Sequence, residues 1–322
     1  MRFPRDFNAV RGDIYGGLTA AVVALPLALA FGVASGVGAI AGLYGAIAVG
    51  FFAAVFGGTD SQVSGPTGPM TVVMGVIVAE HAGNMGEAFA IVFLGGGLQV
   101  LFGTLRIGRF ISYTPYSVVS GFMSGIGVII ILIQVLPFIG QETAPGGPLG
   151  AVGAWPQAIE HLNPQALAIA CLSLGIVIFW PARLRTLLPS PLAALIVCTL
   201  AAIFLLPGAP VIGAVPTGLP EFYLPVFSFD KLPTIVQPAL ILALLGSIDS
   251  LLTSLVADSV TRTRHNSNRE LIGQGIGNMV AGLIGGLPGA GATMRTVVNV
   301  RAGGRTPLSG ALHAVILLAL VL

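Results

Sequence analysis

Long apolar runs alternate in this sequence with short clusters of Gly, Pro and polar residues. An apolar helix of about 20 residues crosses a bilayer, so the recurrence of such runs predicts an all-α, multi-pass membrane protein. The predicted spans are Ile14–Ser35, Ile40–Phe56, Ala88–Thr104, Pro115–Phe138, Ala166–Trp180, Pro191–Leu206, Pro238–Val260, Leu271–Leu287 and a last one that starts near Leu308. Polar loops are predicted over Gly140–Asn163 and Pro207–Pro233. Gly273, Gly277 and Gly282 predict close helix packing.

Two segments break the pattern of continuous spans. The polar, Pro- and Gly-rich segment Asp60–Pro69 precedes the apolar run Met70–Ala79, which is too short to cross a bilayer as a helix. The segment Pro288–Asn299 begins with Gly and Ala and continues with polar residues that include Thr293 and Arg295. Each predicts a short extended piece followed by a half-helix that starts inside the membrane, as at the substrate sites of transporters.

Composition narrows the class of protein further. The chain is 55% hydrophobic and only 8% charged, whereas about a quarter of the residues in a soluble domain are charged. The net charge of +2 and the absence of a basic, aromatic patch argue against a nucleic-acid partner. Cys171 and Cys198 lie in apolar runs and predict neither a disulfide nor a metal site. No Walker or His-Glu-x-x-His motif occurs, so neither an ATP-driven pump nor a zinc intramembrane protease is expected. Composition leaves a Ser/His protease pair open, but His265 falls in a loop and His313 in the last span, so an enzyme is the least expected class.

Basic residues are distributed unevenly between the predicted loops. With the N-terminus in the cytoplasm, 12 of the 14 Lys and Arg residues fall on the cytoplasmic side, as the positive-inside rule requires. These are Arg2, Arg5, Arg11, Arg106, Arg109, Arg183, Arg185, Arg262, Arg264, Arg269, Arg301 and Arg305. Lys231 falls on the outer side, and Arg295 lies within the membrane.

A short internal similarity predicts an inverted repeat. Pro69–Met74 resembles Met294–Asn299 when Thr71 is aligned with Thr296. An odd number of membrane steps separates them, so they run in opposite directions, as in inverted-topology repeats. Chance similarity of two Thr-Val-Val strings is the alternative. We assign residues 1–206 to a first repeat of seven elements and 207–322 to an incomplete second repeat, so we expect further spans beyond this chain.

Asp249 is the acidic residue nearest the middle of a predicted span. Thr253 follows one turn later on the same face of the helix, and Ser250 is adjacent. Asp249 is either a structural carboxylate bonded to a neighbouring helix, or an ion ligand or proton carrier. An acidic group inside a membrane favours the functional interpretation. For Asp258, near the end of the span, a solvated carboxylate or a pair with Arg262 is expected.

Polar residues also mark the starts of the two half-helices. Thr67 and Thr293 flank these starts, where free N–H groups and the helix dipole favour an anion. Either threonine could instead be an ordinary helix cap. Arg295 is either paired with Asp249 for structural reasons or is a fixed positive charge that helps to hold an anion.

Several longer strings resemble the sulfate permease (SulP) family, the prokaryotic relatives of solute carrier family 26. They are Ala24-Leu-Pro-Leu-Ala-Leu-Ala-Phe-Gly32, Gly42-Leu-Tyr44, Ser64-Gly-Pro-Thr-Gly-Pro-Met-Thr71, Gly246-Ser-Ile-Asp-Ser-Leu-Leu-Thr-Ser254, Glu270-Leu-Ile-Gly-Gln-Gly-Ile-Gly-Asn278 and Gly289-Ala-Gly-Ala-Thr293. Within the family, the chain is most similar to sodium-dependent bicarbonate transporters of cyanobacterial type. The resemblance implies a 7+7 inverted-repeat fold with core and gate domains, and a STAS domain that this chain does not contain.

The resemblance also implies binding sites. A sodium site would comprise Asp249, Thr253, Gly291, Ala292 and Thr293, and bicarbonate would contact Thr67, Ala292 and Thr293. Arg295 departs from the small residue expected in bicarbonate members, although other anion-carrying members have an Arg at this position. An Arg near Asp249 could replace the sodium ion electrostatically.

We therefore expect a secondary active transporter of a small inorganic anion. Sodium-dependent bicarbonate symport is the first hypothesis, and a proton-coupled or exchanging carrier of sulfate or a dicarboxylate is the second. An anion channel is a third. We expect no cofactor other than sodium as the coupling ion. The expected surroundings are the lipid bilayer of a bacterial inner membrane, with a cytoplasmic N-terminus and a homodimer as the assembly.

Overall fold

Two compact units make up the chain in the computed structural model. The structure describes residues 7–81, 84–111, 116–144, 147–181, 184, 190–211, 218–225 and 232–322. Unit 1 comprises Met1–Gly121 and Val215–Leu322, and unit 2 comprises Phe122–Ala214. Of the residues that support the predicted orientation, Arg2, Arg5, Arg183, Arg185 and Lys231 lie outside the described residues.

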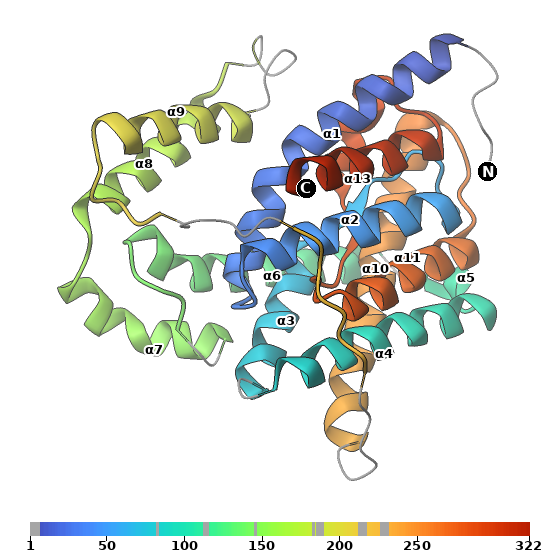
Figure 1. Ribbon diagram of the computed structural model, residues 1–322, viewed down its shortest axis with the longest axis horizontal. Helices are drawn as coiled ribbons and strands as arrows, with labels where there is room; N and C mark the ends of the chain where they lie inside the picture. Colours follow the sequence, from blue (N-terminus) through green and yellow to red (C-terminus); the bar gives the residue numbers. More distant parts are fainter. Residues whose placement is uncertain are drawn as a thin grey trace. The chain divides into compact units, whose positions relative to one another are not determined.

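Helices build unit 1, as predicted. They are α1 (Phe7–Ala34), α2 (Ala39–Phe56), α3 (Gly68–Glu80), α4 (Met85–Thr104), α5 (Gly108–Ile111), α10 (Leu232–Thr261), α11 (Ser267–Leu283), α12 (Thr293–Arg301) and α13 (Pro307–Val321). Helix α2 packs against α1, α13 and α11; α11 in turn packs against α4, and α4 against α10 (Figure 1). Both half-helices, α3 and α12, follow short strands, so the prediction of two broken elements is confirmed.

The glycines of α11 allow neighbouring backbones to approach closely. A Cβ atom added at Gly273 would lie 2.4 Å from the backbone nitrogen of Gly57, and one at Gly282 would lie 2.7 Å from that of Phe93. At Gly277 the nearest atom would be 2.8 Å away. No side chain fits at these distances, so the predicted close packing is confirmed.

Unit 2 contains a helix that the sequence pattern did not predict. Its helices are most of α6 (Tyr116–Phe138), α7 (Gly147–Glu160), α8 (Pro164–Phe179) and α9 (Ser190–Phe204). Helix α7 occupies the segment that was predicted to be a loop over Gly140–Asn163. Its Gly and Pro content disfavours a helix, but Ala151 and Ala158, two turns apart, are buried in a cluster with Leu136. Tertiary packing therefore outweighs the local preference.

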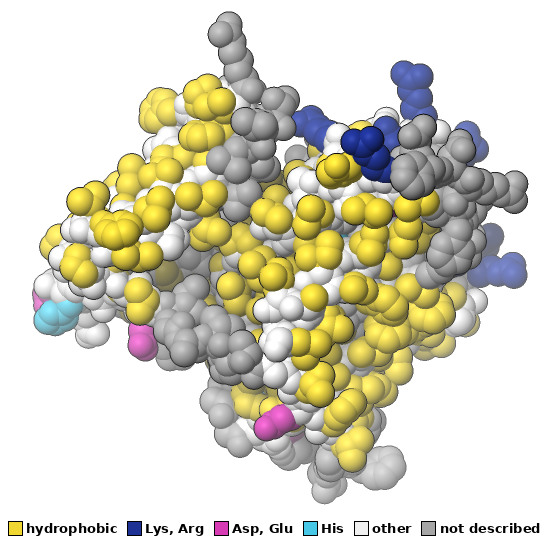
Figure 2. Space-filling model, turned by 45° about the horizontal axis from the view of Figure 1, so that its top comes forward, with side chains coloured by type: hydrophobic (Ala, Val, Ile, Leu, Met, Phe, Trp, Pro, Cys, Tyr) yellow, Lys and Arg dark blue, Asp and Glu magenta, His cyan; other side chains and the backbone are white. Residues whose placement is uncertain are grey.

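Length and exposed surface both fit a membrane-spanning protein. Among the described residues, helical segments long and apolar enough to cross a bilayer are Ala9–Ala34, Ala39–Phe56, Met85–Thr104 and Thr234–Thr261. Large hydrophobic side chains remain exposed on them, such as Leu18 and Val22 of α1 and Leu240 and Ile241 of α10. Figure 2 shows hydrophobic side chains spread over unit 1, with Lys and Arg side chains gathered at one edge.

Candidate functional site

The two helix breaks meet as a small antiparallel sheet. Strand β1 (Ser64–Gly65) pairs with β2 (Ala290–Gly291), with Ser64 opposite Gly291 and Gly65 opposite Ala290. The backbone N–H of Ala292 extends this contact by donating to the carbonyl of Val63 at 2.9 Å. Gly and Pro in these segments prevent a continuous helix, so each of the two segments is extended where they cross and is followed by a half-helix.

Both half-helices begin at this crossing without a side-chain cap. The N-cap residues are Thr67 for α3 and Ala292 for α12, and neither side chain caps its helix. The first turns match: Thr71 N–H donates to Thr67 O, and Thr296 N–H donates to Ala292 O, both at 2.9 Å. Helix N-termini carry free N–H groups and the positive end of the helix dipole, so their convergence favours an anion.

Helix α10 brings several of the predicted sodium ligands to β2. The Thr253 hydroxyl donates to the Gly291 carbonyl at 2.9 Å and lies 2.8 Å from the Thr293 hydroxyl. The Ser250 hydroxyl accepts the Gly291 N–H at 3.1 Å. The structure therefore brings Thr253, Gly291 and Thr293 together, with Ala292 between the last two.

Asp249 lies on the same helix, one turn before Thr253, and is 4% exposed. Its Oδ2 atom and the Thr67 hydroxyl form no hydrogen bond of ordinary geometry with any described residue. Carboxylate, hydroxyl and carbonyl oxygens are the ligands that hard cations prefer, so these residues suit a cation. The described part of the chain has no His, Cys, Asp or Glu cluster of the kind that holds a transition metal.

Arg295 is buried beside the first crossing segment instead of forming an ion pair. Its Nη2 group donates to the Pro66 carbonyl, and its Nη1 group has no partner among the described residues. A Cβ atom added at Gly65 would lie 2.6 Å from Nη1, so a side chain at this position would displace the guanidinium. Within the described residues no ion pair joins Arg295 to Asp249, which leaves the charge of Arg295 available to a bound anion.

The sequence interpretation missed a buried polar face on α11. Glu270, Gln274 and Asn278 are spaced four residues apart and are at most 2% exposed. That spacing places them on one face of a helix, and it was visible in the sequence as the only polar positions between Arg269 and Met279. The periodicity was the signal that could have identified them.

This face of α11 holds both crossing segments in place. Gln274 Nε2 donates to Ser64 Oγ at 2.6 Å, whereas Asn278 donates to the Gly289 carbonyl and accepts the Gly289 N–H at 2.7 Å. Glu270 accepts the Gly58 N–H and a Gln62 amide, each at 2.8 Å. Helix α11 therefore fixes the strands by side-chain hydrogen bonds.

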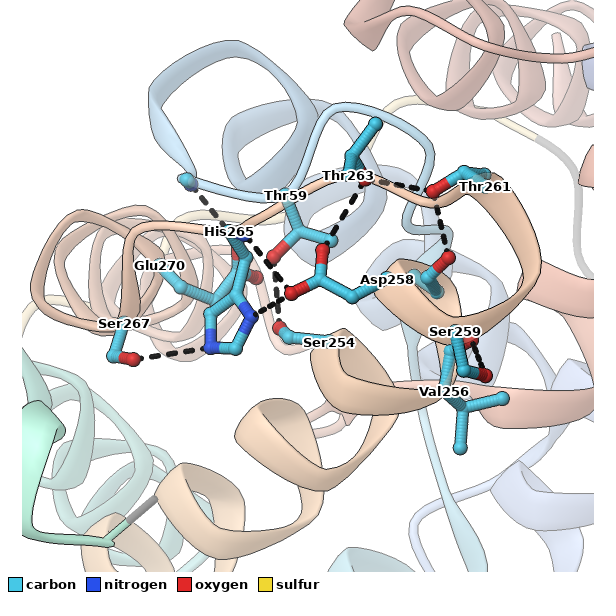
Figure 3. A network of polar contacts seen from close by, with 12 residues as sticks. Thr59, Ser254, Val256, Asp258, Ser259, Thr261, Thr263, His265, Ser267 and Glu270 are labelled. Carbon is cyan, nitrogen blue, oxygen red and sulfur yellow. Dashed lines mark hydrogen bonds and ion pairs between the residues drawn. The ribbon is translucent and has the colours of Figure 1, made fainter.

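A second polar cluster lies at the end of α10, away from the crossing. Asp258 Oδ2 lies 2.7 Å from His265 Nδ1, and His265 Nε2 lies 3.0 Å from Ser267 Oγ (Figure 3). The partner of Asp258 is thus His265, so the alternative of a pair with Arg262 was wrong, while the Asp258 side chain stays 18% exposed. In the same view, Thr59 bonds Ser254 at 2.7 Å. The contacts of His265 join the end of α10 to the start of α11, whereas the Thr59 bond ties α10 to the segment between α2 and β1.

A cavity of about 690 Å³ in unit 1 lies at the far end of α3 from the crossing. Val73, Val76, Ile77, Glu80, His81, Asn84, Glu87, Thr234, Gln237, Pro238 and Ile241 line it. None of the predicted site residues is among them, so the cavity does not define the ion site.

Comparison with known proteins identifies the family of the chain. Residues 10–322 match the model of the sulfate permease family. The chain is 48% identical to "Bicarbonate transporter BicA" of Picosynechococcus sp., over 98% of this chain and 58% of that protein. It is 33% identical to "Putative sulfate transporter YvdB" of Bacillus subtilis, over 100% of this chain and 62% of that protein. The chain thus spans under two thirds of these relatives.

The solved transmembrane domain of a cyanobacterial bicarbonate transporter BicA superimposes with a TM-score of 0.92 at 50% identity, over 98% of this chain and 83% of that one. Murine solute carrier 26 family member A9 shares the fold, with a TM-score of 0.79 at 20% identity, over 99% of this chain and 57% of that one. The chain therefore belongs to the sulfate permease family of multi-pass membrane anion transporters.

Proposed function

We propose that this chain forms the ion-binding core of a secondary active transporter that carries bicarbonate together with sodium. The observation that carries the proposal is the crossing of β1 and β2. There, two helix N-termini converge, and Asp249 Oδ2, Thr67 Oγ1 and Arg295 Nη1 have no partner among the described residues. Buried polar groups without partners are costly, and a bound ligand would satisfy them. Because the site contains both a carboxylate and a guanidinium, a cation and an anion bound together suit it.

In this proposal, sodium binds the oxygens of Asp249, Thr253, Gly291, Ala292 and Thr293. Bicarbonate binds the N–H groups and hydroxyls at Thr67, Ala292 and Thr293, with Arg295 adding positive charge. Coupling follows from electrostatics, because an unneutralised Asp249 carboxylate repels the anion and a bound cation removes that repulsion. The relatives named as bicarbonate transporters, at 48% and 49% identity, support this choice of substrate.

The test is uptake of labelled bicarbonate into proteoliposomes that contain the complete protein, with and without an inward sodium gradient. We expect uptake to require sodium and to be lost in Asp249→Asn. Asp258→Asn is the matched control, since Asp258 bonds His265 at the end of α10, and it should keep its sodium dependence. Uptake that is indifferent to sodium and to Asp249→Asn would contradict the symport.

The second candidate is a proton-coupled or exchanging carrier of sulfate or a dicarboxylate. The buried guanidinium of Arg295, which forms no ion pair with Asp249 among the described residues, favours it, because guanidinium binds oxyanions well. The relative named as a putative sulfate transporter favours it too. Counter-transport with a panel of anions under separate sodium and proton gradients distinguishes the two. Ohmic current without accumulation would instead indicate a channel.

We further propose the wider arrangement that goes with this function. Residues 1–206 and 207–322 belong to two inverted repeats, and the antiparallel pairing of β1 with β2 supports this. The protein lies in a bacterial inner membrane with its N-terminus in the cytoplasm, forms a homodimer, and moves its core against its gate during transport. Cysteine accessibility of Arg11→Cys from each side of the membrane tests the orientation.

A further inference from the structure

His313 is a buried histidine that the proposed ion site does not use. It lies on α13, in an otherwise apolar stretch, and is 0% exposed. Neither ring nitrogen forms a hydrogen bond of ordinary geometry with a described residue, although the Gly310 carbonyl of its own helix is close enough to influence the ring. A neutral imidazole carries one donor and one acceptor, and leaving both unsatisfied in an interior is costly. Such a residue needs a polar neighbour.

Two neighbouring turns of α2 show where that neighbour is. A Cβ atom added at Gly50 would lie 3.1 Å from His313 Nδ1 and 3.2 Å from the Ser64 carbonyl oxygen. Ala46, one turn earlier, lies beside Gly65, where a Cβ atom would be 2.6 Å from Arg295 Nη1. The imidazole and the guanidinium are thus one turn apart along α2 and one residue apart along β1.

One hydrogen bond joins the end of α12 to the start of α13, near these two residues. Asn299 Nδ2 donates to Ser309 Oγ at 2.9 Å. Arg295 is one turn before Asn299 on α12, and His313 is one turn after Ser309 on α13.

We propose that His313 and Arg295 share one buried polar site on the α2 side of β1, where a water molecule bridges their side chains. Through this water, His313 positions the Arg295 guanidinium for the anion. Arg295 Nη1 supplies a donor, the Ser64 carbonyl an acceptor, and the imidazole one of each. A buried water requires 2–4 polar partners, and this set provides them. A second anion suits the site less well, because the Ser64 carbonyl oxygen would repel it.

This inference rests on the proposed anion site, and it assigns His313 a positioning role instead of contact with the anion. The test is a double-mutant cycle. Bicarbonate Kd is measured by calorimetry at saturating sodium on the complete protein, for the parent, His313→Leu, Arg295→Lys and the double variant. His313→Gln, which keeps a donor and an acceptor, is the conservative variant. Leu317→Val, at a buried apolar position one turn further along α13, controls for core packing.

We expect His313→Leu to weaken binding about tenfold in the parent, within the range of coupling between neighbouring residues. In the Arg295→Lys background the same change should alter Kd by less than about twofold. His313→Gln should bind within about threefold of the parent, and Leu317→Val should lower only the thermal midpoint.

Equal losses in both backgrounds, or a loss in His313→Gln as large as in His313→Leu, would overturn the inference. If His313→Leu does not fold, His313→Gln is measured instead, in the parent and in Arg295→Lys. The inference then requires that any change in Kd caused by His313→Gln in the parent disappears in the Arg295→Lys protein. Absence of bicarbonate binding in the parent protein would instead refute the proposed function, so the two failures are distinguishable.

Discussion

The two half-helices meet at the same point but differ in the polarity of their buried faces. Under the alignment of Thr71 with Thr296, Met70 of α3 corresponds to Arg295 of α12, and Met74 to Asn299. The four side chains are at most 2% exposed. Met70 packs against Gly246 of α10, whereas Arg295 bonds Pro66, and Asn299 bonds the Ser61 carbonyl at 2.9 Å.

This difference shows that side chains of α12 hold the segment that leads into α3, whereas no comparable polar side chains of α3 hold the segment that leads into α12. The polar side chains of α12 reach across to the backbone that leads into β1 and α3. The buried side chains of α3 are instead apolar, apart from Thr71, which bonds its own helix at 2.8 Å. The Thr67 hydroxyl stays unbonded at the crossing. Geometrical similarity therefore does not imply equal roles, and the following substitutions test this asymmetry.

The largest effect is expected from Arg295→Met, which makes α12 resemble α3 at this position. Loss of a buried, charge-assisted hydrogen bond costs about 1.5–3 kcal/mol, and the anion also loses a fixed positive charge. We expect initial uptake to fall roughly 10- to 100-fold, measured in proteoliposomes. Arg301→Met, at an exposed position in the last turn of α12, is the control and should transport normally. Comparable losses in both variants would contradict a special role for Arg295.

The next effect concerns the strand pair Gly65 and Ala290. Gly65 has φ of 154°, and an added Cβ atom would collide with the Arg295 guanidinium. Gly65→Ala should therefore destabilise the protein by about 1–3 kcal/mol. Ala290→Gly should cost about 1 kcal/mol or less. Thermal midpoints of the purified proteins in detergent check this, and equal costs at the two positions would argue against the asymmetry.

A smaller effect is expected at the aligned threonines. The Thr296 hydroxyl accepts the Val63 N–H at 3.0 Å, so Thr296→Val leaves that buried N–H unsatisfied at a cost of about 1–3 kcal/mol. Thr71 bonds only within its own helix, and Thr71→Val should cost about 0.5 kcal/mol or less. Denaturation in detergent measures both. If Thr71→Val proved the more damaging, α3 would be an anchor as well.

The smallest change in stability is expected from Thr67→Val, because the Thr67 hydroxyl bonds no described residue. Unfolding should shift by about 0.5 kcal/mol or less, while the KM for bicarbonate should rise about fivefold through loss of one hydrogen bond to the anion. Steady-state uptake against bicarbonate concentration measures the KM. An unchanged KM would remove Thr67 from the proposed site.

Local sequence was sufficient to predict the half-helices, since Gly and Pro break a helix wherever they cluster. It was also sufficient to select Asp249, because a carboxylate in the middle of an apolar run is conspicuous. It was not sufficient for α7, where burial of Ala151 and Ala158 stabilises a helix that composition disfavours. The predicted pairing of Asp258 with Arg262 was also wrong. Arg262 has the right helical spacing, but Asp258 instead bonds His265, which lies beyond the end of the helix.

The sequence by itself determined that this is a multi-pass membrane protein with two breaks, and it identified the polar residues at them. Both depend on composition within a few turns of chain. Only the tertiary structure decided which partners those residues have: Pro66 for Arg295, Val63 for Thr296, and Gly289 for Asn278. The first two pairs join residues more than 200 positions apart, so their geometry depends on how α2, α10 and α11 pack around the crossing, and no local pattern encodes it.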